Sequence, residues 1–259
     1  MARRVRPVLR RPLVWARHRE IQEGDAVLDE YPKSGGTWLT FMLAEAITGN
    51  PVDFLNHTHL SPAVGAKRRG QAILPNGKYL LRTHEPYRTE YRISRPIYLV
   101  RHVADVLVSY HQTLRWLTLD DVDPKLFIRL ALAGHIDGYG SWPEHVRSWL
   151  EAPVDVCVIR YEDLRIDPIP TLRRAVEHMG LPLDDAVLER AVRSNQFDAM
   201  RTKEQQTLRR AYSKRDHSGH FVRSGRSGES REVFDDDDWK LIDRHAGSML
   251  RLLGYTLKP

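Results

Sequence analysis

The sequence of 259 residues contains one cysteine, Cys157, so no disulfide can form within the chain. It has no apolar run long enough to cross a bilayer, and its arginine-rich start is not followed by the apolar core of a signal peptide. Valines alternate around Cys157 as in a strand, which predicts a buried thiol. We therefore expect a cytoplasmic protein rather than a disulfide-stapled secreted scaffold or a membrane-tethered enzyme.

The charge excess is small but unevenly placed. The chain has 40 Lys and Arg against 34 Asp and Glu, and seven of the arginines lie in its first nineteen residues. We interpret 1–22 as a basic, solvated N-terminal extension and 23–259 as one domain. A nucleic-acid arm or a membrane-surface contact is the alternative for the extension. With 41% hydrophobic and 29% charged residues, the composition is that of a globular protein, and we expect neither nucleic acid nor membrane as a partner.

Short apolar runs alternate with amphipathic helical segments along the chain. This order predicts an α/β domain with a central parallel sheet flanked by helices. The predicted strands are 26–30, 79–83, 97–101 and 154–161, and the predicted helices are 37–49, 104–117, 124–133, 143–150, 169–179, 184–193 and 235–253. The stretch 202–231 is polar, basic and glycine-containing, which predicts a long mobile loop.

Residues 31–38 read Y-P-K-S-G-G-T-W and join the first predicted strand to the first predicted helix. A small-residue turn before a helix presents free backbone N–H groups and the positive end of the helix dipole at one place. Lys33 adds a full charge, and the hydroxyls of Ser34 and Thr37 add two donors. The segment predicts a phosphate-binding loop, although its lysine precedes the glycines, unlike the order G-x-x-x-x-G-K-[ST].

This loop resembles the 5′-phosphosulfate loop of the sulfotransferases that use 3′-phosphoadenosine-5′-phosphosulfate (PAPS). Four later segments resemble the same family in the same order. They are R-T-H-E-P at 82–86, Y-L-V-R-H-V-A-D-V-L-V-S-Y-H at 98–111, R-Y-E-D-L at 160–164 and F-V-R-S-G at 221–225. The resemblance runs from about Val27 to the C-terminus and implies a P-loop NTPase-like sulfotransferase fold.

The resemblance implies two catalytic residues. Lys33 would stabilise negative charge on the leaving phosphate oxygen, and His84, which follows the second predicted strand, would take the proton of the acceptor. Arg82 stands where cytosolic relatives usually carry lysine. Glu85 is the second candidate base, because carbohydrate-type sulfotransferases often use a glutamate; side chains alternate in direction along an extended chain, which argues against it.

The resemblance also implies a nucleotide site. Arg101 and Ser109 would hold the 3′-phosphate, with Asp105 either capping the following helix or orienting Arg101. Many family members carry threonine in place of Gly36, and lysine in place of Ser224, so this chain has one hydroxyl and one charge fewer. The 5′-phosphate would lie against Lys33, Ser34, Gly35, Gly36 and Thr37. The adenine would lie against Trp38, Tyr161, Asn195 and Phe197. A closing loop would bring Arg223, Ser224 and Gly225 to the 3′-phosphate.

The resemblance thus implies a PAPS-dependent sulfotransferase that transfers a sulfuryl group to a hydroxyl or amine by in-line displacement, leaving adenosine 3′,5′-bisphosphate (PAP). A small molecule or a carbohydrate would be the acceptor, and no metal is expected. A P-loop kinase-like transferase is the first alternative, and it predicts a G-K-[ST] loop that the sequence lacks. A non-catalytic nucleotide-binding protein is the second. The sequence leaves the oligomeric state open.

Overall fold

The structure is a computed structural model that describes residues 7–118, 122–208, 222, 225 and 227–259. Its sheet has the strand order β2-β1-β3-β4, with β1 (Ala26–Glu30), β2 (Leu80–Thr83), β3 (Arg95–Val100) and β4 (Cys157–Arg160), all parallel. Each strand lies within three residues of a predicted one at its start. The chain leaves β1 toward one edge of the sheet and leaves β3 toward the other, so a crevice opens between their carboxyl ends.

Side chains of the strands alternate between two apolar cores. Val27, Leu81 and Tyr98 belong to one core, and Leu28 and Leu80 belong to the other. Since successive residues of a strand point to opposite faces, both faces of this sheet are buried. This is why β1 reads as an unbroken buried run, including Asp29.

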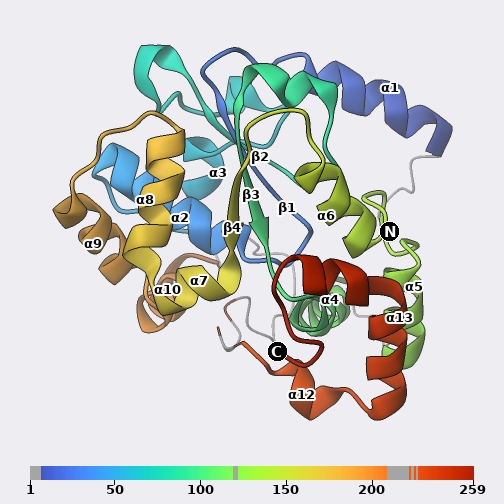
Figure 1. The fold of residues 1–259 in the computed structure, drawn as a ribbon. Coiled ribbons are helices and arrows are strands. Elements are labelled where there is room, and N and C mark those ends of the chain that lie inside the picture. Colours follow the sequence, from blue (N-terminus) through green and yellow to red (C-terminus); the bar gives the residue numbers. More distant parts are fainter. Residues whose placement is uncertain (1–6, 119–121, 209–221, 223–224, 226) are drawn as a thin grey trace.

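Helices cover both faces (Figure 1). One face carries α2 (Gly36–Thr48), α8 (Pro168–His178) and α9 (Asp185–Ser194), while the other carries α4 (Val103–Thr118), α5 (Pro124–Leu132), α6 (Trp142–Leu150) and α13 (Asp236–Leu252). The shorter elements are α3 (His57–Leu60), η1 (Lys67–Arg69), η2 (Pro75–Gly77), η3 (Thr89–Ile93), α7 (Tyr161–Ile166), α10 (Phe197–Lys203), η4 (Glu204–Leu208) and α12 (Ser230–Val233). No helix in these described ranges has the length and apolar composition needed to span a bilayer.

Two differences from the predicted elements bear on the site. The prediction carried the last strand through Tyr161, but the chain turns there into helix α7. The start of the predicted loop at 202–231 is helical, because α10 and η4 extend to Leu208, and α12 lies near its end. Most of the residues between Leu208 and Ser230 lie outside the described part of the chain.

The predicted extension at 1–22 is helical and partly buried from Pro7 onward, and its residues 1–6 lie outside the described part of the chain. Helix α1 (Pro7–His18) buries Val14 and His18, which lie one helical turn apart on the same face. The His18 ring lies 2.8 Å from the Tyr91 hydroxyl through Nε2, and burial lowers its pKa. The many arginines of this segment made the buried face formed by Val14 and His18 difficult to recognise from the sequence. Leu13 and Trp15 remain exposed.

Candidate active site

A cavity of about 280 Å³ lies beside the crevice at the carboxyl ends of β1, β2 and β3. Its lining comes from six separate parts of the sequence. The lining residues are Glu30, Pro32, Lys33, Gly35, Gly36, Thr37, Trp38, His84, Arg101, Ser109, Tyr161, Arg165, Phe197, Met200, Val222 and Gly225. The fold therefore brings most of the predicted site residues to one place.

The loop between β1 and α2 adopts left-handed backbone at two positions. Lys33 has φ 77° and Gly35 has φ 111°, and a side chain at Gly35 would also overlap the Tyr161 ring, 2.7 Å from the new Cβ. Left-handed residues in such a loop turn successive N–H groups toward a shared concavity. The loop thus has the backbone of an anion cradle. Ser34 does not line the cavity. Its hydroxyl donates to the Tyr31 carbonyl at 2.8 Å and so stabilises the loop.

A carboxylate that we did not predict lies in this cradle. Glu30 is 8% exposed and accepts the backbone N–H of Gly36, the first residue of α2. A Cβ on Gly36 would fall 2.5 Å from the Glu30 carboxyl group, so glycine is the residue that fits here. Burial raises the pKa of Glu30, against the opposing charges of His84 and Lys33 and the Gly36 hydrogen bond. Its position at the end of the buried first strand was the available sequence signal.

His84 lies after β2 with its ring against the end of β1. Its Nδ1 is 3.0 Å from the Glu30 carbonyl oxygen, and its ring meets Tyr139 edge to face at 5.7 Å. A carbonyl oxygen only accepts, so Nδ1 carries a hydrogen, and in the neutral form of the ring the lone pair is then on Nε2. Glu85 does not line the cavity, and its carbonyl accepts the Trp149 indole N–H. Arg82 does not line the cavity either, and its Nε donates to the Ser61 carbonyl at 2.8 Å.

A buried polar group lies behind His84. His145 Nε2 is 3.1 Å from the His84 carbonyl oxygen, and its Nδ1 is 2.9 Å from the Tyr98 hydroxyl. Burial lowers the pKa of His145 to about 3, so the ring is neutral. Nε2 therefore donates to His84, and Tyr98 donates to Nδ1. Asp29, 3.6 Å from His145 Nε2, is fully buried, and burial raises its pKa well above the usual range.

Arg101 follows β3 and faces the same cavity from the other side of the crevice. Its guanidinium lies 4.3 Å from the centre of the Tyr161 ring and 3.9 Å from the Asp105 carboxylate, and the residue is 7% exposed. Ser109, one helical turn beyond Asp105 on α4, lines the cavity with it. An arginine stacked on a ring and held by a carboxylate has few rotamers, which suits binding of an anion.

The late segment of the chain is tied to this region through Asp105 and Tyr161. Asp105 accepts hydrogen bonds from the Gly228 and Ser230 backbone N–H groups and from the Ser230 hydroxyl. The Tyr161 hydroxyl donates to the Gly225 carbonyl at 3.4 Å. Gly225 lines the cavity, whereas Arg223 and Ser224 lie outside the described residues.

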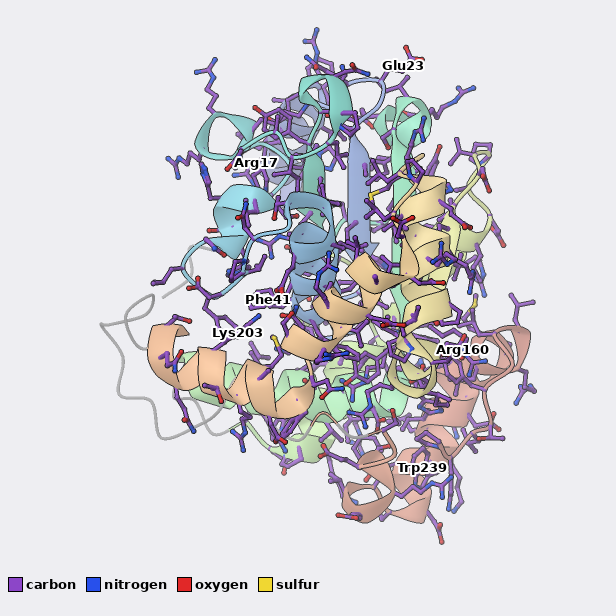
Figure 2. The ribbon with its side chains drawn as sticks, turned by 90° about the vertical axis from the view of Figure 1, so that its left-hand side faces the viewer. Arg17, Glu23, Phe41, Arg160, Lys203 and Trp239 are labelled. Atoms are coloured by element: carbon purple, nitrogen blue, oxygen red, sulfur yellow. The ribbon has the colours of Figure 1, made fainter. Side chains whose placement is uncertain are left out.

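Trp38 and Asn195 interact in a way that changes the predicted role of Asn195. The indole N–H of Trp38 donates to the Asn195 carbonyl at 2.7 Å, and the Trp38 and Tyr161 rings meet edge to face at 5.7 Å. The Asn195 side chain is fully buried between Glu45 and Lys203 and does not line the cavity. We predicted a direct adenine contact for Asn195, but its carbonyl holds Trp38 instead. Figure 2 shows Lys203 close to Phe41, and the Lys203 ammonium lies 5.6 Å from the centre of the Phe41 ring.

Four further lining residues were missed from the sequence: Pro32, Arg165, Met200 and Val222. Arg165 lies on α7 one turn after Tyr161, so both reach the same side. Glu162 and Asp163, which directly follow Tyr161, are the acidic residues typical of a first helical turn. This pair of acidic residues indicates that the strand ends before Tyr161, and it places Arg165 on the same helix face as Tyr161. In the described ranges, no group of three or more His, Cys, Asp or Glu side chains is arranged to hold a metal ion.

The chain is similar in sequence to one protein family over most of its length. The profile of the family described as "Sulfotransferase domain" matches residues 23–254. Sulfotransferase 1B1 of Mus musculus is 27% identical over 250 residues, covering 86% of this chain and 82% of the relative. Sulfotransferase 1A1 of Bos taurus is 28% identical, covering 88% and 85%. Flavonol 3-sulfotransferase of Flaveria bidentis is 24% identical, covering 90% and 84%.

Solved structures share the fold. Retinol dehydratase in complex with androsterone and the inactive cofactor PAP superposes with a TM-score of 0.73 at 18% identity, covering 89% of this chain and 81% of that one. Mouse sulfotransferase SULT7A1 complexed with PAP gives 0.67 at 23% identity, covering 88% and 84%. The predicted α/β fold with a parallel sheet between helices is thereby confirmed.

Proposed function

We propose that this chain, which belongs to the sulfotransferase domain family, transfers a sulfuryl group from PAPS to a hydroxyl of a small-molecule acceptor. One observation carries the proposal. A single cavity gathers Lys33 from the loop after β1, His84 from the end of β2 and Arg101 from the end of β3. Two cations and a histidine at the crevice of a parallel sheet suit an anionic nucleotide and a proton transfer.

The nucleotide would lie across the crevice. The amides of the loop and the start of α2 would bind the 5′-phosphosulfate, as helix N-termini bind phosphates. Arg101 and Ser109 would bind the 3′-phosphate, because they line the same cavity from the end of β3 and from α4, while the loop enters it from β1. Trp38, Tyr161 and Phe197 offer aromatic surface for the adenine. The structures of two relatives in this fold hold PAP, which supports the choice of nucleotide.

The reaction follows from this placement. The acceptor oxygen attacks sulfur, the S–O bond to the 5′-phosphate breaks, and both bonding electrons leave with the phosphate oxygen of PAP. Lys33 would stabilise the charge that develops on this oxygen, as positioned cations do in phosphoryl transfer. His84 Nε2 would take the acceptor proton, because the Glu30 carbonyl fixes the hydrogen on Nδ1. His145 would hold the His84 backbone in place through its carbonyl.

The acceptor is proposed from the wall of the cavity and from the names of relatives. Met200 and Val222 add aliphatic surface to the lining of the cavity. One relative is named for a flavonol, and one relative of known structure holds androsterone. An apolar compound with a hydroxyl group fits this combination of walls and base. A carbohydrate or an amine acceptor is the outcome that the turnover test would reveal instead.

Calorimetric titration tests the nucleotide site first. We expect metal-independent binding of PAP, with much weaker binding of 5′-AMP, which lacks the 3′-phosphate, and of Mg-ATP. Turnover with PAPS is then measured with a phenol, a steroid, a flavonol and an amino sugar. Preference for Mg-ATP would favour a kinase-like enzyme, and PAP binding without transfer to any hydroxyl compound would leave a nucleotide-binding protein.

A further inference from the structure

The Glu30 carboxylate occupies a donor that the proposed anion site needs. It accepts the N–H of Gly36, the first residue of α2. This N–H lies at the positive end of the helix dipole and has no acceptor within the helix. Both residues line the cavity, and Glu30 is 8% exposed. The carboxylate is thus an internal anion in the cradle, placed where a bound phosphosulfate would also draw its hydrogen bonds.

The backbone at position 36 accommodates this arrangement. A Cβ there would lie 2.5 Å from the Glu30 carboxyl carbon, so any other residue would push the carboxylate off the N–H group. Glycine at 36 therefore allows the closest approach of a carboxylate to the helix start. The contact is a built feature of the site rather than a chance rotamer of a surface glutamate, since both partners are buried.

Several charged and titratable groups surround Glu30. Lys33 comes from the loop, Arg82 and His84 from β2 and its end, Asp29 from β1 and Tyr98 from β3. The cations Lys33 and Arg82 favour the charged form of Glu30 before a nucleotide binds. Addition of a nucleotide phosphate brings a second anion to the same helix start, and like charges in a poorly solvated site raise each other's affinity for protons.

We propose that Glu30 is a positioning residue that holds the cradle closed as an internal anion, and that the nucleotide binds by displacing it from the Gly36 N–H with uptake of one proton from solvent. The proton goes to the Glu30 carboxylate, which becomes a neutral carboxylic acid beside the bound phosphate. This inference rests on the proposed function, since it needs PAP or PAPS to occupy the cradle. It gives nucleotide affinity a pH dependence set by one side chain.

Proton uptake tests the inference directly. PAP is titrated into the wild-type chain and into Glu30→Gln at pH 7 in buffers of different ionisation enthalpy, which gives the protons taken up per nucleotide. Gln keeps the oxygen that accepts the Gly36 N–H and cannot be protonated. Protonation of the nucleotide itself is common to both titrations and cancels in their difference. We expect wild type to take up as much as one proton more than Glu30→Gln.

The pH dependence of affinity gives a second, independent measurement. Between the Glu30 pKa of the free and of the bound protein, the wild-type Kd for PAP should rise by about tenfold per pH unit relative to Glu30→Gln. Glu151→Gln, an exposed glutamate on the far end of α6, is the matched control and should keep the wild-type dependence. PAP binding with equal proton uptake in wild type and Glu30→Gln overturns the inference alone. Absence of PAP binding in both overturns the proposed function as well.

Discussion

The Asp105 carboxylate accepts hydrogen bonds from both the backbone N–H and the hydroxyl of Ser230, a residue 125 positions later in the chain. The same carboxylate accepts the Gly228 N–H and lies 3.9 Å from the Arg101 guanidinium. Asp105 therefore connects Arg101, which we propose binds the 3′-phosphate, to the late segment that contains Gly228 and Ser230. Neither of the two roles that the sequence suggested for it, a helix cap or an orienting partner of Arg101, included this link.

Asp105→Ala should lower the stability of the fold. It leaves the buried Ser230 donors without their acceptor, which should lower the free energy of unfolding by about 1–3 kcal/mol. Urea denaturation measures the loss, with the exposed Glu189→Ala as a control expected within about 0.5 kcal/mol of wild type. An unchanged midpoint for Asp105→Ala would show that this link contributes nothing to folding.

His84→Ala should abolish transfer with little effect on nucleotide binding. Loss of a general base lowers turnover by about 10²–10⁴-fold, and the ring contacts Glu30 and Tyr139 rather than the loop amides. Turnover with PAPS and calorimetry with PAP separate the two effects. Residual turnover near the wild-type rate would move the base role to Glu85 or to solvent.

Arg101→Ala should weaken PAP and leave 5′-AMP almost unaffected. Removing a charged hydrogen-bond partner of the 3′-phosphate costs about 1.5–3 kcal/mol, or about 10- to 150-fold in Kd. 5′-AMP lacks this phosphate, so it serves as the internal control for damage to the adenine side, where Arg101 stacks on Tyr161. Equal losses for both ligands would assign Arg101 a structural role instead.

Gly36→Ala should strain the cradle through Glu30. The new Cβ would approach the Glu30 carboxyl group to 2.5 Å, and overpacking of this kind costs about 1–3 kcal/mol. Combining it with Glu30→Ala removes the clash, so the double variant should recover part of the stability in thermal or urea unfolding. Additive losses in the double variant would contradict a direct clash.

Asp29→Asn should change how stability depends on pH. Burial raises the pKa of Asp29 well above its usual value, so the folded chain holds this proton more tightly than the unfolded chain. The stability that Asp29 contributes to the folded chain is complete at pH values below its pKa in the unfolded chain. It is lost as pH rises through its pKa in the folded chain, and the free energy of unfolding then falls by up to about 1.4 kcal/mol per pH unit. Urea unfolding from pH 4 to pH 8 should show wild type losing stability relative to Asp29→Asn, whereas parallel curves would mean that Asp29 does not titrate in this range.

The sequence by itself determined the parallel α/β fold and the residues that follow each strand. Buried runs must be strands between helices, and parallel strands put their carboxyl ends at one edge, so the loop at 31–38, His84 and Arg101 were predictable as neighbours. The helix α1 contacts and the helix α7 were missed, because a short apolar stripe among arginines and a strand that ends at Tyr161 give weak local signals.

Only the tertiary structure decided which polar groups meet. Glu30 on Gly36, Asp105 on Ser230 and the Asn195 carbonyl on Trp38 join positions whose spacing in sequence carries no period. Hydrogen bonds of this kind depend on how packed elements approach one another to within an ångström, and a sequence pattern records burial but not that approach. The sequence therefore determined the loops that carry the chemistry, and the packing of α2, α4 and α7 decided which side chains support them and which carboxylate occupies the cradle.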